Sequence, residues 1–229
     1  MKISIVIPTL NEAHNLSVLI PYLRANSLKT SIAEIIISDG ESEDNTHELF
    51  KEDKDIIFIS GSRGRAQQMN RGAQIASGEI YYFLHADSFP PSGFDQKILG
   101  EIGLGHYAGC FRLKFDDAHP FLRISQWFSK WNFPICRGGD QSLFITKKQF
   151  EEMNGFNEAY TIYEDNEFTN RLYKKGNFIV IQDAILTSAR KYHEIGVYRL
   201  QYHFAVIHLK KLLGASPEAL YTYYTKHIR

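Results

Sequence analysis

Polar residues follow three apolar runs of the sequence, at the point where each run ends. The most apolar run, Ile80 to Leu84, stops at His85-Ala86-Asp87-Ser88, and the other two lead into Thr9 to Glu12 and Asp39 to Thr46. In open α/β sheets, ligands bind at the carboxyl ends of the strands, where loop backbone groups have no ladder partner. These residues therefore predict a polar ligand site that contains Asp87. The alternative is that Asp87 only ends its strand in an Asx turn.

Two adjacent acids stand at the start of a predicted helix in the second half of the chain. Glu164 and Asp165 open this helix, which we expect to end at Gly176. Acids in a first helical turn often only complement the helix dipole, which is worth about 0.3–1 kcal/mol. Taken alone, the pair therefore indicates a helix cap, and only its neighbouring motifs favour a catalytic role.

Alternating strands and helices must position the polar segments of the first half. Short runs rich in β-branched residues predict strands at 3–8, 35–38, 56–59 and 80–84, and helices are expected between them. This alternation indicates βαβ units and a mostly parallel sheet flanked by helices, with the polar segments on one edge. The dinucleotide variant of such a fold is not supported, because no G-x-G-x-x-G follows the first strand and no phosphate loop is present.

The second half is less regular. Strands are expected at 107–115 and 142–146, and a helix at 121–131 carries an apolar stripe of Phe121, Ile124, Phe128 and Trp131. Such a stripe is usually core, and the alternative is a wall of an acceptor site. From Ile195 onward, we expect two amphipathic, aromatic helices separated at 214–217. These C-terminal helices are expected to contact a membrane surface, a second copy in a homodimer, or their own domain.

The composition excludes several classes of protein. Lysine plus arginine equal aspartate plus glutamate at 26 each, so no net charge attracts nucleic acid, and we expect no nucleic-acid partner. Two cysteines provide neither a disulfide framework nor metal-binding spacing. The first residues resemble no signal peptide, and no apolar window reaches the length of a membrane span. These features predict a cytoplasmic protein, either free or peripheral at the inner face of the membrane.

Taken together, the motifs resemble family 2 glycosyltransferases with the GT-A fold. Ile7-Pro8-Thr9-Leu10-Asn11-Glu12 is similar to the opening signature of that family, and Ser38 to Thr46 is similar to its second motif. Leu84 to Ser88 resembles the metal-binding motif, and Tyr163-Glu164-Asp165 resembles the catalytic motif. Because these motifs occur in the family's order, the resemblance implies a GT-A α/β fold over about the first 180 residues.

A narrower resemblance covers nearly the whole chain. Gly139-Asp140-Gln141, Thr187 to Lys191 and Leu213 to Pro217 are similar to bacterial radical-SAM/selenodomain-associated glycosyltransferases. We therefore expect a glycosyltransferase domain at 1–190, with its donor half at 1–90 and its acceptor half at 91–190. A C-terminal helical extension at 191–229 follows.

The family resemblance also implies the residues of the donor site. Asp39 would accept a hydrogen bond from the base, and Arg65 and Arg71 would meet the base or a phosphate. Residues on the first and third motifs complete the donor site, namely Pro8, Thr9, Asn11, Glu12 and Ala86. The implied donor is a nucleotide sugar, with a UDP-sugar favoured over a GDP-sugar.

The implied reaction is a single displacement that inverts the anomeric centre. Asp165 would be the general base, with Glu164 beside it in the catalytic motif. Asp87 would bind a divalent cation, Mn²⁺ or Mg²⁺, which offsets the growing charge of the leaving diphosphate. The family usually has a first acid where this chain has His85, so His85 is the weaker candidate ligand, and an imidazole ligand would favour Mn²⁺.

The acceptor is not identified by the sequence. Its predicted contacts, or those of a phosphate near it, are Gly139, Asp140, Gln141, Arg190 and Lys191. Two other functions remain open, namely a nucleotidyltransferase and a catalytically impaired protein that only binds sugar nucleotides. The first normally has a Gly-rich basic loop after its first strand, which Pro8 to Glu12 does not supply. The second does not account for Asp165, since binding alone requires no base.

Overall fold

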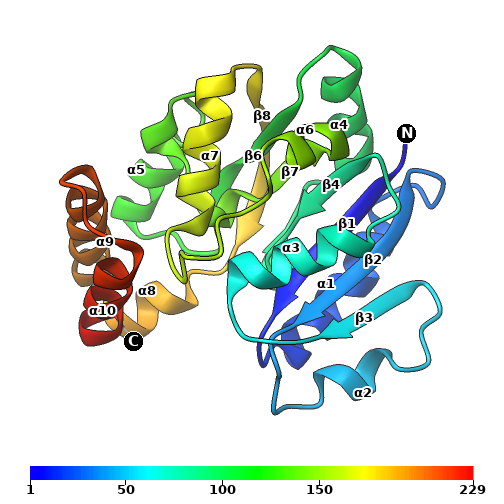
Figure 1. The fold of residues 1–229 in the computed structure, drawn as a ribbon, viewed down its shortest axis with the longest axis horizontal. Coiled ribbons are helices and arrows are strands. Elements are labelled where there is room, and N and C mark those ends of the chain that lie inside the picture. Colours follow the sequence, from blue (N-terminus) through cyan, green and yellow to red (C-terminus); the bar gives the residue numbers. More distant parts are fainter. Residues whose placement is uncertain (229) are drawn as a thin grey trace.

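The computed structural model describes residues 1–228, and its centre is a sheet of eight strands (Figure 1). The strands are β1 (Ile3–Thr9), β2 (Ile32–Asp39), β3 (Ile56–Ser60), β4 (Ile80–Phe83), β5 (Ser88–Phe89), β6 (Ala108–Phe115), β7 (Leu143–Thr146) and β8 (Phe178–Thr187), in the order β3-β2-β1-β4-β7-β6-β8-β5. Strands β3, β2, β1 and β4 are parallel, and β7 is antiparallel to both of its neighbours. The expected mostly parallel α/β sheet is confirmed.

Helices cover both faces of this sheet and continue beyond it. They are α1 (Ala13–Ala25), α2 (Thr46–Phe50), α3 (Arg65–Ile75), α4 (Phe94–Gly103), α5 (Pro120–Phe128), α6 (Lys147–Glu152), α7 (Glu164–Lys175), α8 (Arg190–Ile195), α9 (Val197–Leu212) and α10 (Pro217–His227). Two 3₁₀ turns, η1 (Pro134–Cys136) and η2 (Gly139–Gln141), lie between α5 and β7.

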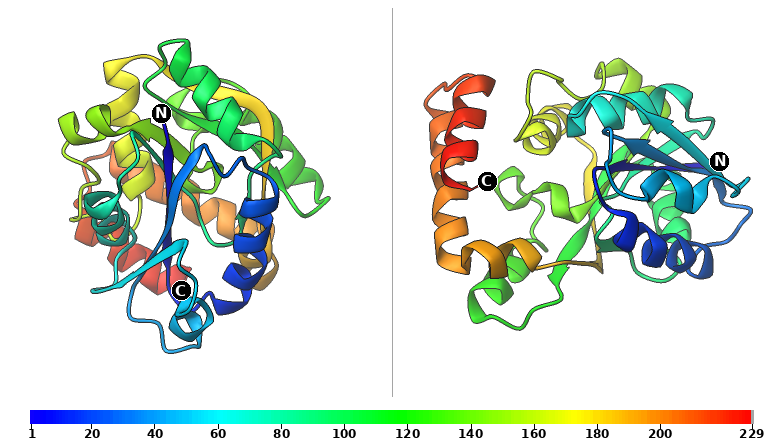
Figure 2. Two further views of the ribbon diagram at one scale, coloured as in Figure 1. Left: turned by 90° about the vertical axis from the view of Figure 1, so that its right-hand side faces the viewer. Right: turned by 90° about the horizontal axis from the view of Figure 1, so that it is seen from below.

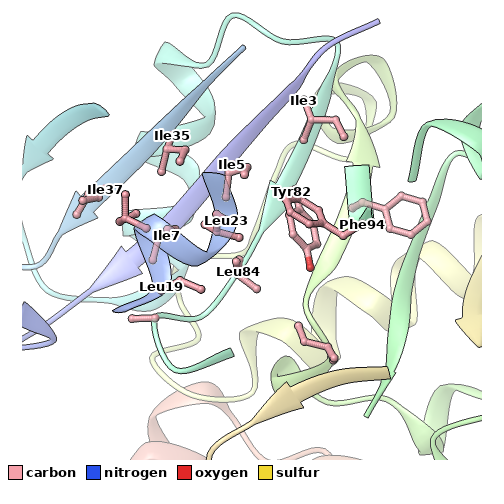
Figure 3. Packing of buried hydrophobic residues seen from close by; sticks show 14 of the residues in the cluster. Ile3, Ile5, Ile7, Leu19, Leu23, Ile35, Ile37, Tyr82, Leu84 and Phe94 are labelled. Atoms are coloured by element: carbon pink, nitrogen blue, oxygen red, sulfur yellow. The ribbon is translucent and has the colours of Figure 1, made fainter. Parts of the chain in front are cut away.

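The central strands are mostly apolar because both of their faces are buried. Ile3, Ile5 and Ile7 of β1 point to one face and pack with α1 (Figure 3). Val6 points to the opposite face, where it belongs to a second apolar cluster with Met69 of α3. Alternate residues of a strand point to opposite faces, so a strand covered on both sides is apolar at most positions. The buried Ser4 of β1 is hydrogen-bonded to Glu34 and to the Gly78 N–H.

Helix α7 is anchored on the same face of the sheet as α3. Phe168 of α7 is fully buried, and its ring centroid lies 4.5 Å from that of Phe156 and 5.7 Å from that of Phe150. Gly72 lets α3 approach the sheet, because a Cβ at this position would overlap Val6. The first turns of α3 and α7 are thereby held close together.

The C-terminal helices pack on their own chain. A third apolar cluster joins Leu200, Ile207 and Leu220 of α9 and α10 to Phe115 and Tyr160 of the α/β part. Both figures place α9 and α10 as a pair beyond one end of the sheet (Figures 1 and 2). Across residues 1–228, every helix is too short or too polar to cross a membrane.

The apolar stripe of α5 faces solvent, so its interpretation as core was wrong. Ile124, Phe128 and Trp131 are exposed, whereas Leu122 on the other side of the helix is fully buried. The sequence pattern identified an apolar face correctly, but a helical period does not indicate which neighbour that face meets.

Candidate active site

The loops after β1 and β2 are bound to each other at the carboxyl edge of the sheet. The Asn11 backbone N–H donates to Ser42 Oγ at 2.8 Å, and the Glu43 N–H donates to Asn11 Oδ1 at 2.8 Å. The N–H of Ala13 donates to Asp44 Oδ2 at 3.0 Å. Two of the predicted donor-binding segments therefore form one rigid unit.

Asp39 ends β2 as a buried carboxylate that accepts three hydrogen bonds. It accepts from the Ser42 N–H at 2.9 Å, from Ser42 Oγ at 2.5 Å and from Ser60 Oγ at 3.3 Å. Thr9 is also buried and Pro8 is half-buried, whereas Asn11 remains exposed. These contacts fix the end of β2 at the floor of the site.

Two long side chains of α3 bind the strand ends through their main-chain carbonyls. Gln68 Nε2 donates to the carbonyls of Thr9 at 2.6 Å and Ser38 at 2.8 Å, a role that the sequence analysis missed. Arg71 donates to the carbonyl of Asp39 at 2.7 Å, so its contact with a nucleotide stays a prediction. The one available signal for Gln68 was a polar residue on the buried side of a helix.

The two acids that begin α7 meet Arg65, which begins α3. The Arg65 guanidinium donates to Glu164 Oε1 at 3.1 Å and lies 3.6 Å from Asp165 Oδ2. The Glu164 side chain is only 1% exposed. Burial and the charge of Asp165 raise the pKa of Glu164 to about 7, against the opposing effect of Arg65. Asp165 is more accessible and points toward the loop after β4.

Strained backbone precedes these acids. Tyr163, the N-cap of α7, has a φ of 72°, in the left-handed region that a bulky residue rarely adopts. Its hydroxyl lies 3.1 Å from His208 Nδ1 of α9. Residues in such conformations concentrate at functional sites, where the surrounding structure holds them in place. The C-terminal extension is therefore connected to the residue directly before Glu164.

His85, at the end of β4, lies between two carboxylates. Its Nδ1 is 3.7 Å from Asp140 Oδ1, and its Nε2 is 4.0 Å from Asp165 Oδ2. Burial and Arg65 act to lower the pKa of His85, but the pairing with Asp140 and the charge of Asp165 outweigh them and raise it. Burial alone would raise the pKa of Asp140, yet His85 and more distant cations lower it. His85 and Asp140 thus favour their charged forms.

The turn at 138–141 reaches the predicted base through its backbone. A Cβ at Gly139 would overlap Asp165 Oδ2 and would come within 3.1 Å of His85 Cε1, whereas a Cβ at Gly138 would meet nothing within 4 Å. Gln141 is buried, and its Oε1 accepts from the Gly138 N–H at 3.3 Å. Among the described residues, its Nε2 finds no partner.

The two basic residues at the start of α8 have different partners. Arg190 donates to Glu12 Oε1 at 3.3 Å, which joins the C-terminal part of the chain to the loop after β1. Lys191 donates to the hydroxyl of Tyr224 on α10, and its Nζ lies 4.7 Å from the centre of that ring. Neither residue is simply a solvated charge, and Lys191 contributes to lowering the pKa of Asp140.

The predicted metal ligand Asp87 stands apart from the other acids. It is half-buried at the end of β4, and Ser88 Oγ lies 3.5 Å from its Oδ1, while the neighbouring Ala86 is buried. Within residues 1–228, no three His, Cys, Asp or Glu side chains converge as a preformed cation site. His85 faces the carboxylates of Asp140 and Asp165, and the metal-binding role of Asp87 stays a prediction.

Comparison of the sequence with known protein families identifies the family of this chain. The model of the family described as Glycosyl transferase family 2 matches residues 4–179, which include all of the loops described above except the start of α8. The chain belongs to glycosyl transferase family 2. Nothing in the comparisons tests the narrower resemblance to radical-SAM-associated glycosyltransferases.

Two curated relatives are similar over parts of this family 2 chain. It is 25% identical to the succinoglycan biosynthesis protein ExoA of Rhizobium meliloti (strain 1021), over 78% of this chain and 60% of the relative. It is 31% identical to a dolichol-phosphate mannosyltransferase of Pyrococcus furiosus, over 46% of this chain and 31% of the relative. The chain thus spans less than two thirds of the length of either relative.

Solved structures confirm the GT-A-like α/β fold. TarS 1–349 of S. aureus in complex with UDP superimposes with a TM-score of 0.69 at 18% identity, covering 82% of this chain and 61% of TarS 1–349. Its complex with UDP-GlcNAc gives a TM-score of 0.68 at 19% identity, covering 82% of this chain and 58% of that one. At this level of identity, the similarity establishes the fold alone.

The close approach at Gly139 generates a matched pair of variants. Gly139→Ala should reduce glycosyl transfer by about 100-fold, because the new methyl group displaces Asp165 from its position. Gly138→Ala adds the same methyl group one residue earlier in open space and should retain near wild-type turnover. Steady-state kinetics of both variants, with circular dichroism to verify folding, makes the comparison. Equal turnover in the two variants would show that the position of Asp165 is unimportant.

The raised pKa of Glu164 predicts a pH dependence of stability. Between the unfolded pKa of about 4.5 and the folded pKa of about 7, the folded state holds a proton that the unfolded state releases. The contribution of Glu164 to the free energy of unfolding is therefore fully present below pH 4.5 and is lost as the pH rises through 7.

Urea denaturation between pH 4.5 and 8 measures this effect. Relative to Glu164→Gln, the wild-type protein should lose stability with a slope of up to about 1.4 kcal/mol per pH unit. Glu48→Gln, which changes an exposed acid of α2, is the control and should follow the wild-type curve. Parallel curves for wild type and Glu164→Gln would contradict the assignment.

Proposed function

We propose that this chain transfers a sugar from a nucleoside diphosphate sugar to an acceptor hydroxyl, with inversion at the anomeric carbon. The observation that carries this proposal is the position of Asp165 in a member of family 2. Its accessible carboxylate lies at the edge where β1, β2 and β4 end, between Arg65 and His85. In functional terms, residues 1–90 would bind the donor, 91–190 the acceptor, and 191–229 would complete the acceptor side.

The donor would bind over the joined loops after β1 and β2. Asp39, Thr9 and Asn11 would hold the base and ribose, together with Pro8, Glu12 and Ala86, while Arg65 would face the phosphates. A UDP-sugar is favoured because the similar TarS structures are complexes with UDP and UDP-GlcNAc. The buried carboxylate of Asp39 supports this role, since it is already oriented by three hydrogen bonds.

Asp165 would act as the general base. Its carboxylate would take the proton of the acceptor hydroxyl as that oxygen forms a bond to the anomeric carbon. The bond from this carbon to the diphosphate breaks at the same time, and the nucleoside diphosphate departs with its electron pair. Glu164 would orient Arg65 beneath the reacting groups, because its buried side chain is bonded to that guanidinium.

A divalent cation fits one residue of this site. Asp87 would hold Mn²⁺ or Mg²⁺ with one carboxylate, as such ions are often bound by one or two carboxylates plus substrate phosphates. The bound ion would neutralise charge on the leaving diphosphate. His85 would be the weaker ligand, because its two ring nitrogens already face the carboxylates of Asp140 and Asp165.

The acceptor would enter opposite the donor, beside the turn at 139–141. The buried and unpartnered Nε2 of Gln141 supports this location, since a polar group without a partner is costly unless a ligand or water satisfies it. Asp140 and Lys191 would contact acceptor hydroxyl or phosphate groups nearby, and Arg190 would position Glu12.

Donor hydrolysis without acceptor tests the proposed reaction. With a UDP-sugar and Mn²⁺, we expect slow release of UDP, which Asp165→Asn lowers by about 100-fold or more because it removes the base. Asp183→Asn is the control, since it makes the same change at an exposed carboxylate that pairs with Lys97. Pyrophosphate as the product would favour a nucleotidyltransferase. Bound UDP with no release would favour a protein that only binds sugar nucleotides.

A further inference from the structure

An exposed aromatic patch extends from α5 into η1. We define it by six large apolar residues, namely Ile124, Trp127, Phe128, Trp131, Phe133 and Ile135. Phe133 is 59% exposed, Trp127 is 52% exposed and Ile135 is 89% exposed. Single exposed apolar residues are ordinary, but six within twelve positions form a continuous patch that soluble surfaces rarely show.

Helix α5 has its apolar side turned away from the protein. Leu122 is its buried anchor, and Ser129, just after the helix, accepts from the Leu113 N–H at 3.0 Å. An amphipathic helix normally buries its apolar stripe. In α5 the apolar stripe is instead exposed to solvent, so the helix presents its aromatic residues outward.

The segment that carries the aromatic patch has charges of one sign. From Ala118 to Gly139 the sequence contains no aspartate or glutamate. Arg123 is exposed, and Lys130 Nζ lies 4.3 Å from the ring centre of Trp127 and 5.2 Å from that of Trp131. A lysine over tryptophan rings keeps its ammonium group at the polar edge of an apolar surface.

The aromatic patch is held rigidly by the chain behind it. Buried Arg137 donates to the Ser129 carbonyl at 2.7 Å and to the Cys110 Sγ at 3.1 Å, which fastens the segment after α5 to β6. Phe121 at the start of α5 contacts Tyr198 of α9, with ring centroids 5.6 Å apart. The patch is therefore a preformed surface, which lowers the entropic cost of binding.

We propose that the aromatic patch binds the surface of an anionic lipid bilayer. Tryptophan rings favour the headgroup region, where one edge of the ring is apolar and the other is hydrated. Arg123 and Lys130 would meet lipid phosphates, because cations are attracted to an anionic membrane surface. The patch is distinct from the outer face of α9, and the proposal does not depend on the reaction at Asp165.

Intrinsic fluorescence reports on this proposal directly, because Trp127 and Trp131 are the two tryptophans of the chain. Vesicles of phosphatidylglycerol and phosphatidylcholine should shift the emission of the full-length protein to shorter wavelength and should carry the protein in flotation. Phosphatidylcholine vesicles alone should do so much less, and salt should weaken binding because it screens the charges. Unchanged emission together with no flotation would overturn the proposal.

Variants identify which surface is responsible. Trp127→Ser/Trp131→Ser should lower the vesicle partition coefficient by about tenfold or more, since it removes two interfacial rings. Leu212→Ser/Leu213→Ser is the matched control on the exposed end of α9 and its following residue, and it should bind vesicles like wild type. Circular dichroism would verify that both variants fold.

Two results would show that the aromatic patch does not bind the bilayer. Loss of flotation only in Leu212→Ser/Leu213→Ser would assign membrane contact to the C-terminal helices. A concentration-dependent dimer in sedimentation equilibrium, absent in Trp127→Ser/Trp131→Ser and unaccompanied by vesicle binding, would assign the aromatic patch to a second copy.

Discussion

The ion pair between Arg65 and Glu164 is the contact on which the site depends. It joins the first turns of two helices that are 99 positions apart in sequence, and it does so around a carboxylate that is almost fully buried. The Glu164 oxygen accepts this hydrogen bond whether the side chain is protonated or charged, and a buried polar group without a partner would be destabilising, so the contact fixes α3 and α7 relative to each other. Asp165, the next residue after Glu164, is thereby directed at His85 and at the backbone of Gly139. The contact of buried Glu164 with Arg65 therefore determines the position of the more accessible Asp165.

The same construction extends to both ends of the chain. The loops after β1 and β2 are held together by main-chain N–H groups that donate to side-chain oxygens, and Gln68 donates to a carbonyl of each strand. Arg190 reaches Glu12 across 178 positions of sequence, and His208 of α9 meets the hydroxyl of strained Tyr163. The C-terminal helices therefore act as part of the site's framework, packed on the domain through their own apolar cluster.

The sequence predicted β1, β2, β4 and the polar loops that follow them, because strands buried on both faces are mostly apolar, but it did not predict β5 or β8. It also predicted which loops meet, since parallel strands bring their carboxyl ends to one edge. It did not predict the direction of the α5 stripe, because a helical period defines a face without its neighbour. The partners of Arg71, Gln68 and Lys191 were likewise inaccessible, since they are carbonyls and a ring contributed by distant elements. The two carboxylates beside His85 were not predicted either, since Asp140 and Asp165 come from elements distant in sequence.

The most direct test of a nucleotide-sugar site is the thermal stability of the protein with UDP, GDP, CDP or dTDP, each with and without Mn²⁺. A ligand that binds only the folded state stabilises it by about 2.7 kcal/mol at a hundredfold excess over its Kd. We expect UDP to raise Tm only when Mn²⁺ is present. We expect Asp87→Ala to lose most of this rise and to show no effect of Mn²⁺ on what remains. No rise with any of the four diphosphates, in the presence or absence of Mn²⁺, would contradict the proposed nucleotide-sugar site.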